Sequence, residues 1–143
     1  MRCLALAAAL AGAANAAAGA AVATTRGDAQ GGEAIYARCL ACHALGYDRV
    51  GPRHCGLLGR RAGSVRGFQY SAAMKKSKIV WNEKTLDRFI ANPLMAVPGT
   101  NMTYAGVADA RERADLIAYL IQANGSAECR QLLDTKEIPW HAS

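Results

Sequence analysis

The chain has 143 residues, enough for one domain, and its 52% hydrophobic and 20% charged composition is typical of a globular protein, not a disordered or fibrous one. It carries 17 Lys and Arg against 11 Asp and Glu, a formal net charge of +6, which favours contact with acidic surfaces. The basic residues are scattered instead of forming one long run, so no nucleic-acid partner is expected.

The N-terminus has the pattern of a secretory signal peptide. Arg2 is followed by an alanine-rich apolar run that ends in small residues near Ala23. The alternative is a retained membrane anchor, but glycine and asparagine interrupt the run, and its strongest apolar part is shorter than the ~20 residues of a span. We assign residues 1–23 to the signal peptide and residues 24–143 to one periplasmic domain.

The first expected element of that domain is a short helix over residues 31–37, running into Cys39. Residues 46–71 are so rich in glycine that a long regular element is excluded. Because a loop of this length in a compact domain usually wraps around something, we expect it to enclose a ligand.

Three further helices are expected downstream, over residues 71–78, 83–92 and 110–124. Pro93 is expected to stop the second, and Asp109 and Gly125 to cap the third. No alternation of apolar and polar residues indicates a sheet, so the expected fold class is all-α. Such a chain buries a thin core and usually needs disulfides, a metal or a cofactor to stay folded.

Cys39, Cys42 and His43 form a Cys-x-x-Cys-His motif, in which each fixed residue has its own chemical task. Two thiols three positions apart can each add to a vinyl group of one haem, and the adjacent imidazole can then bind iron. A zinc site would need a second close Cys/His pair, a thioredoxin-like site a βαβ context, and a plain disulfide would leave His43 without a purpose. We therefore expect one covalently attached haem c.

Met102 is the candidate for a second axial ligand. It follows the Pro98-Gly99 turn, outside any apolar stripe, whereas Met74 and Met95 are adequately explained as core residues. A thioether ligand raises the reduction potential of iron, which suits an electron carrier. From spacing alone, the ligand and an ordinary loop methionine remain equally open.

The order of these residues resembles that of class I c-type cytochromes, most of all the mitochondrial and soluble bacterial branch. The resemblance implies a small cytochrome c fold of short helices and long loops around one haem, with a core over residues 31–124 and a tail over residues 125–143. The matching positions are Gly32, Tyr36, Cys39 to His43, Gly51, Pro52, Gly56 to Arg60, Gly67 to Ser71, Trp81, Asn92, Pro93, Pro98 to Met102 and Asp115 to Leu120.

The resemblance also implies a set of site residues. It implies that His43 and Met102 are the two axial ligands of the iron, and that the Pro52 carbonyl accepts a hydrogen bond from the His43 ring. Each remaining position also has an ordinary explanation, as a core aromatic, a surface cation or a turn residue. The expected partners of the haem propionates are Arg60, Tyr70, Trp81 and Thr100.

Four residues depart from the usual pattern of the resembling family. Phe89 replaces a frequent tyrosine, so a hydroxyl that would reach the methionine sulfur is missing. Met74, Asn101 and Tyr104 also replace common residues around the haem. These departures leave the reduction potential and the docking of partners open.

Cys55 and Cys129 have no counterpart in the family pattern. In an oxidising compartment we expect them to form a disulfide, and the alternative is two free thiols, which geometry would require if their Cα atoms lay beyond ~7 Å. The residues after Gly125, including Pro139 and Trp140, are expected to be a docking tail or disordered.

The function expected from these features is a one-electron carrier, not an enzyme. We expect a monomer that passes electrons between redox proteins with acidic docking surfaces and touches membrane complexes transiently. The alternative is a haem-containing subunit of a dehydrogenase or oxidase complex. A haem enzyme or gas sensor would need an open iron position, and of the other histidines, His54 and His141, the first is expected to pack at the loop surface.

Overall fold

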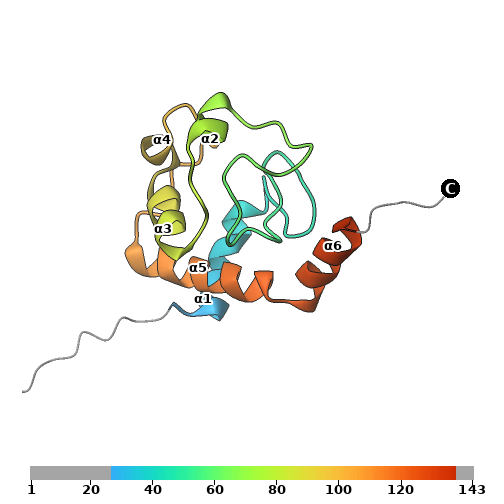
Figure 1. Ribbon diagram of the computed structural model, residues 1–143. Coiled ribbons are helices and arrows are strands. Elements are labelled where there is room, and N and C mark those ends of the chain that lie inside the picture. Colours follow the sequence, from blue (N-terminus) through green and yellow to red (C-terminus); the bar gives the residue numbers. More distant parts are fainter. Residues whose placement is uncertain (1–26, 138–143) are drawn as a thin grey trace, which may run out of the picture.

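The computed structural model describes residues 27–137, which form short helices joined by long loops (Figure 1). Within this range there is no strand, since Arg61 and Val80 make only an isolated bridge, and the predicted all-α class is confirmed. The assigned signal peptide, Pro139, Trp140 and His141 lie outside the described residues. The helical elements are α1 (Ala29–Tyr36), the 3-10 turn η1 (Ala37–Cys39), α2 (Ala72–Lys76), α3 (Glu83–Ala91), α4 (Pro93–Ala96), α5 (Ala110–Asn124) and α6 (Ala127–Glu137).

Polar caps set the starts of the main helices. The Asp28 carboxylate accepts hydrogen bonds from the first backbone N–H groups of α1. Asn82 and Thr85 cap α3 reciprocally, each side chain accepting from the other residue's backbone N–H. The Asp109 side chain accepts from the backbone of Glu112 at the start of α5. These local bonds explain why the expected bounds of α3 and α5 lie within one residue of the observed ones.

Pro93 stops α3, as expected, but it also begins α4, a short helix that was not expected. Pro93 follows the Asn92 cap there, at a position where the missing N–H of proline costs nothing. Of the two alternatives for the residues after Gly125, disorder is wrong as far as Glu137, because Ala127–Glu137 form α6, and a docking role stays a prediction. None of the described helices has the length and apolar character required to cross a membrane.

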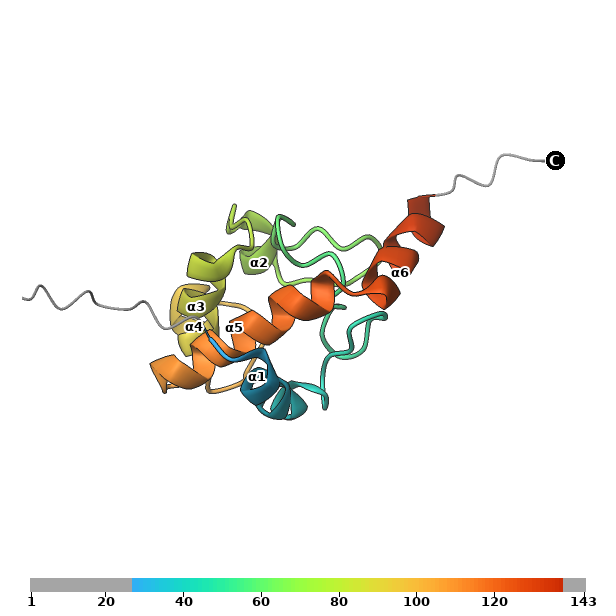
Figure 2. The same ribbon diagram turned by 90° about the horizontal axis from the view of Figure 1, so that it is seen from below.

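Helix α1 crosses α5, and this crossing forms the base of the fold (Figure 2). A side chain at Gly32 would overlap the Asp115 carbonyl, so only glycine lets the two backbones approach this closely. Tyr36, 3% exposed, lies one turn further along α1, and its ring centroid is 5.0 Å from that of Tyr119. Gly32 and Tyr36 therefore both lie at the contact between α1 and α5.

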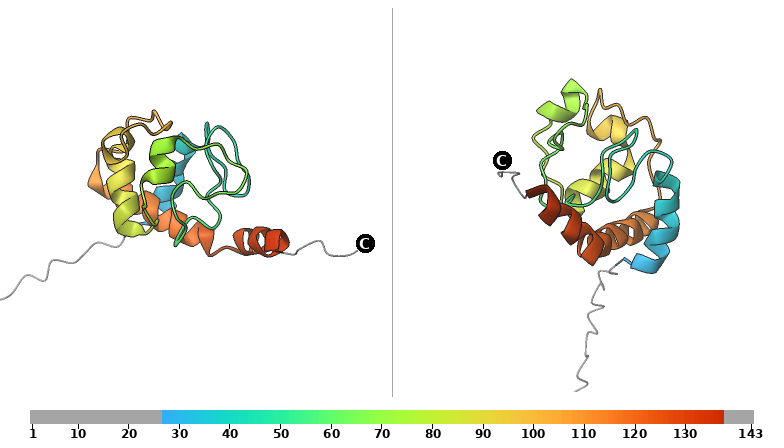
Figure 3. Two further views of the ribbon diagram at one scale, coloured as in Figure 1. Left: turned by 45° about the horizontal axis from the view of Figure 1, so that its top comes forward. Right: turned by 90° about the vertical axis from the view of Figure 1, so that its right-hand side faces the viewer.

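Helix α3 packs on α5, and Leu86, Phe89 and Ile90 are its buried residues. The loop over residues 40–71 runs along the other side of the fold and contains no helix, as expected. Figure 3 shows, on its right, that the helices and this loop encircle the middle of the molecule. The arrangement leaves a cavity between them, which holds the candidate site.

Helix α6 packs against the long loop. The sulfur atoms of Cys55 and Cys129 are in bonding contact, with their Cα atoms 5.1 Å apart, inside the range that a disulfide needs. Leu132 lies against Gly46 and Leu133 against Gly56, so α6 contacts the loop on both sides of Cys55. The segment after α5 is thus a part of the folded domain up to Glu137.

Candidate haem site

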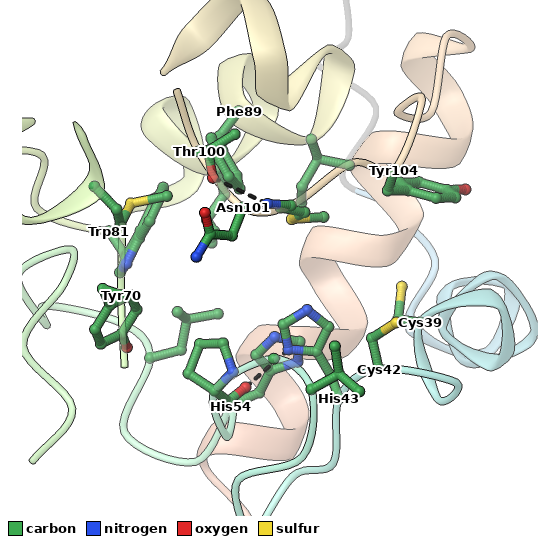
Figure 4. A pocket seen from close by; sticks show the side chains of 18 of the residues that line it. Cys39, Cys42, His43, His54, Tyr70, Trp81, Phe89, Thr100, Asn101 and Tyr104 are labelled. Carbon is green, nitrogen blue, oxygen red and sulfur yellow. Dashed lines mark hydrogen bonds between the residues drawn. The ribbon is translucent and has the colours of Figure 1, made fainter. Parts of the chain in front are cut away.

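The cavity is lined mainly by apolar side chains from α1, α3, α5 and the loops between them. Cys39, Cys42 and His43 lie on one side of it, and Thr100 and Asn101 lie on the opposite side (Figure 4). Two segments that are far apart in the sequence therefore face each other across the cavity. A flat apolar group bound between them would be reached from both faces.

The Cys-x-x-Cys-His segment is a tight helical turn. The backbone N–H groups of Cys42 and His43 both donate to the Cys39 carbonyl, at 3.1 and 2.9 Å. Cys39 and Cys42 are the two unpaired cysteines among the described residues. Burial raises the pKa of the Cys39 thiol, with a smaller opposing effect from Arg38. Both thiols line the cavity, as two thioether bonds to one haem require.

His43 is oriented by two contacts with the loop that follows it. Its Nδ1 donates a hydrogen bond of 2.8 Å to the Pro52 carbonyl, as expected, so Nε2 is left as the nitrogen that can bind a metal. A side chain at Gly51 would overlap the imidazole ring, so the glycine makes room for it. Burial lowers the pKa of His43, while the Pro52 bond opposes this, and the imidazole is kept in its neutral, metal-binding form.

Met102 lies in a loop that hydrogen bonds hold in shape. The buried Thr100 hydroxyl accepts from the Met102 backbone N–H at 3.2 Å, and the Thr100 N–H donates to the Val97 carbonyl at 3.0 Å. Met102 lines the cavity, and so does the buried Met74. Met95 is 76% exposed and does not line it, so the expected core position of Met95 is wrong. The structure thus offers two thioethers to the cavity, and the loop opposite His43 carries Met102.

All four residues expected beside the propionates line the cavity: Arg60, Tyr70, Trp81 and Thr100. The Arg60 guanidinium donates to the carbonyls of Cys55 and Arg53, at 3.1 and 2.9 Å, and so also holds the long loop. Burial raises the pKa of Tyr70, which keeps its hydroxyl protonated as a donor. Trp81 is 7% exposed and lies 5.1 Å from Phe89, ring to ring.

His54 is not at the loop surface, where we expected it. Its imidazole lines the cavity and stacks on His43, with ring centroids 4.3 Å apart. Burial, together with His43 and Arg60, lowers the pKa of His54 well below its usual value, so the ring is neutral. Its position two residues after Pro52, whose carbonyl binds His43, is the sequence signal that could have placed it there.

These residues fit a covalently held haem. The cavity has mainly apolar walls, and it contains the two free thiols, the oriented imidazole of His43 and two thioethers. Within residues 27–137 there is no cluster of three or more His, Cys, Asp or Glu side chains that could hold a bare metal ion. Iron at this site would therefore need the four nitrogen ligands of a macrocycle, with side chains supplying the axial positions.

Comparison with known proteins agrees with this site. The family model described as Cytochrome c matches residues 29–124, which include the whole site and end before α6. Cytochrome c2 of Blastochloris viridis is 44% identical over 100 residues, covering 68% of this chain and 79% of that protein. Cytochrome c 2.1 of Caenorhabditis elegans is 44% identical over 97 residues, covering 66% and 87%.

A solved structure gives the same result for the fold. Cytochrome cH from Methylobacterium extorquens superposes with a TM-score of 0.66 at 40% sequence identity. The likeness covers 67% of this chain and 99% of that one.

Proposed function

Because this chain belongs to the cytochrome c family, and so is an electron carrier with covalently bound haem c and not an enzyme, we propose that His43 and Met102 ligate its iron and that neither ligand leaves during turnover. The bound haem iron supplies the chemistry, the gain and loss of one electron. The observation that carries the proposal is the placement of the Met102 loop across the cavity from His43.

The protein's own residues have three tasks in this proposal. Cys39 and Cys42 attach the haem, and the Pro52 carbonyl fixes the ring of His43. The apolar walls exclude water, which favours the less charged, reduced state of the iron. Arg60, Tyr70, Trp81 and Thr100 are proposed to hold the propionates, and their lining of the cavity supports this.

We further propose that the carrier is a periplasmic monomer that docks on acidic surfaces of redox partners. Exposed lysines on and after α2 support this, because Lys75, Lys76 and Lys78 form no ion pair with any described residue and α2 follows the cavity-lining Ser71. Attraction of this kind raises association rates and weakens with salt. Electron transfer to an acidic partner should therefore slow as ionic strength increases.

Replacement of Met102 tests the ligation. Met102→Ala should remove the weak far-red absorption band that a methionine–iron(III) bond gives, lower the reduction potential, and open the reduced iron to carbon monoxide. The wild-type protein should show the band and bind no carbon monoxide at neutral pH. Absorption spectra and a redox titration of the purified holoprotein measure all three effects.

Two other methionines provide matched controls. Met95→Ala changes an exposed side chain outside the cavity and should leave the band unchanged. Met74→Leu removes the second thioether that lines the cavity and should also keep the band. If Met74→Leu loses the band while Met102→Ala retains it, the ligand assignment is wrong.

A further inference from the structure

His54 and His43 are stacked in the cavity. Their ring centroids are 4.3 Å apart and their planes differ by 22°, so one flat face of the proposed ligand is covered by a second imidazole. The Pro52 bond holds the ring of His43 only at Nδ1, on its edge. Contact with its face restrains a different motion, namely rotation of the ring plane about the bond to the chain.

His54 is itself held in place by a side-chain and a backbone contact. Its Nδ1 shares a hydrogen bond of 3.0 Å with the hydroxyl of Tyr36, a buried residue of α1. Its backbone N–H donates to the carbonyls of Ala44 and Leu45, both at 3.1 Å. Tyr36 in turn packs against Tyr119 of α5, so the ring of His54 is connected to the rigid α1–α5 crossing.

We propose that His54 is a positioning residue that fixes the plane of the His43 imidazole, with the Tyr36 hydroxyl holding His54 in register. The proposal rests on His43 being the axial ligand. The plane of an axial imidazole determines how its π orbitals overlap the iron d orbitals, and thereby how unpaired spin is distributed over the macrocycle. His54 thus acts on the iron only through His43.

The test uses three variants of the ferric holoprotein and the pattern of haem methyl shifts in proton NMR, which reports the ligand plane. His54→Leu removes both the ring and its hydrogen bond and should redistribute the four methyl shifts. His54→Phe keeps a flat ring and should stay closer to wild type than His54→Leu. Tyr36→Phe removes only the hydroxyl that holds His54 and should move the shifts in the same direction as His54→Leu, by less.

Tyr47→Phe is the matched control, because Tyr47 is 64% exposed and does not line the cavity. The haem methyl shifts of this variant should be those of wild type. The far-red band should be present in every variant, because none of them changes an axial ligand. A wild-type protein without the band would contradict the ligand assignment, and this outcome is independent of the methyl shifts. A wild-type methyl pattern in His54→Leu would overturn the positioning role, and so would equal redistribution in His54→Leu and His54→Phe. If His54→Leu yields no holoprotein, an unchanged pattern in Tyr36→Phe overturns it.

Discussion

Arg38 connects the haem-attachment turn to α5 at the scale of a single residue. It directly precedes Cys39, and its guanidinium donates to both carboxylate oxygens of Glu112, at 2.7 and 2.9 Å. This hydrogen bond holds the pKa of Glu112 below its usual value. Both side chains are exposed to solvent, so the pair orients the two segments more than it stabilises the fold.

Arg38→Gln should therefore raise the pKa of Glu112 towards the usual glutamate value, which carboxyl NMR titration measures. A depressed carboxyl pKa gives stability that is present above the unfolded-state pKa and lost as pH falls through the folded-state pKa. The variant should accordingly lose less stability than wild type on acidification. Arg88→Gln, at an exposed arginine of α3, is the control, and a Glu112 pKa that is the same in Arg38→Gln and wild type would refute the assignment.

Residue roles were predictable where the chemistry is local. The spacing of Cys39, Cys42 and His43 predicts haem attachment because three neighbouring side chains act on one group. Met102 needed the family resemblance, since its position opposite His43 depends on the whole fold. His54 was misplaced for the same reason, because stacking on His43 arises only when the loop folds back at Pro52.

At the scale of elements, the α1–α5 crossing depends on Gly32. Gly32→Ala should lower the free energy of unfolding by about 3 kcal/mol, because the new methyl group overlaps the backbone of α5 and forces the helices apart. Denaturant unfolding of the holoprotein measures the change.

Gly31→Ala provides the matched control, one position away on the same helix. There a methyl group would lie 3.2 Å from the Asp28 carboxylate, which can shift, and alanine favours the helix, so stability should stay within about 1 kcal/mol of wild type. Equal losses in the two variants would show that the crossing does not depend on close backbone approach.

The elements were predictable where capping and periodicity agree. Asn82 and Asp109 precede apolar residues at helical spacing, and α3 and α5 begin directly after them. Helix α4 was missed because Pro93 was interpreted as a stop, although proline also suits a first helical position. Helix α6 lacks a clear apolar stripe, so its helical form was missed, although the expected pairing of Cys55 with Cys129 places this segment on the loop. The contact of Leu132 with the loop has no such sequence signal.

At the scale of the whole molecule, the haem and the contact between α6 and the long loop compensate for a small core. The long loop contains no helix and is held by hydrogen bonds from Arg60 and by contacts with α6. The sequence indicates this need through its glycine content and short helices, and the expected pairing of Cys55 with Cys129 places the segment after Gly125 on the loop. What the sequence did not predict is that this segment is a helix. Loss of the haem, or of the contact between α6 and the loop, should therefore strongly lower the free energy of unfolding.

The proposed Cys55–Cys129 disulfide gives a prediction at this scale. It would close a chain segment with a sequence separation of 74, and Cys129→Ala should lower the free energy of unfolding by about 4 kcal/mol on the chain-entropy estimate. The far-red band should persist, because neither cysteine ligates the haem. The Cys55→Ala/Cys129→Ala double variant should have the same free energy of unfolding as reduced wild type, and adding reductant should not lower it further. Alkylation of both thiols in the native, oxidised protein would show instead that α6 packs on the loop without a covalent bond.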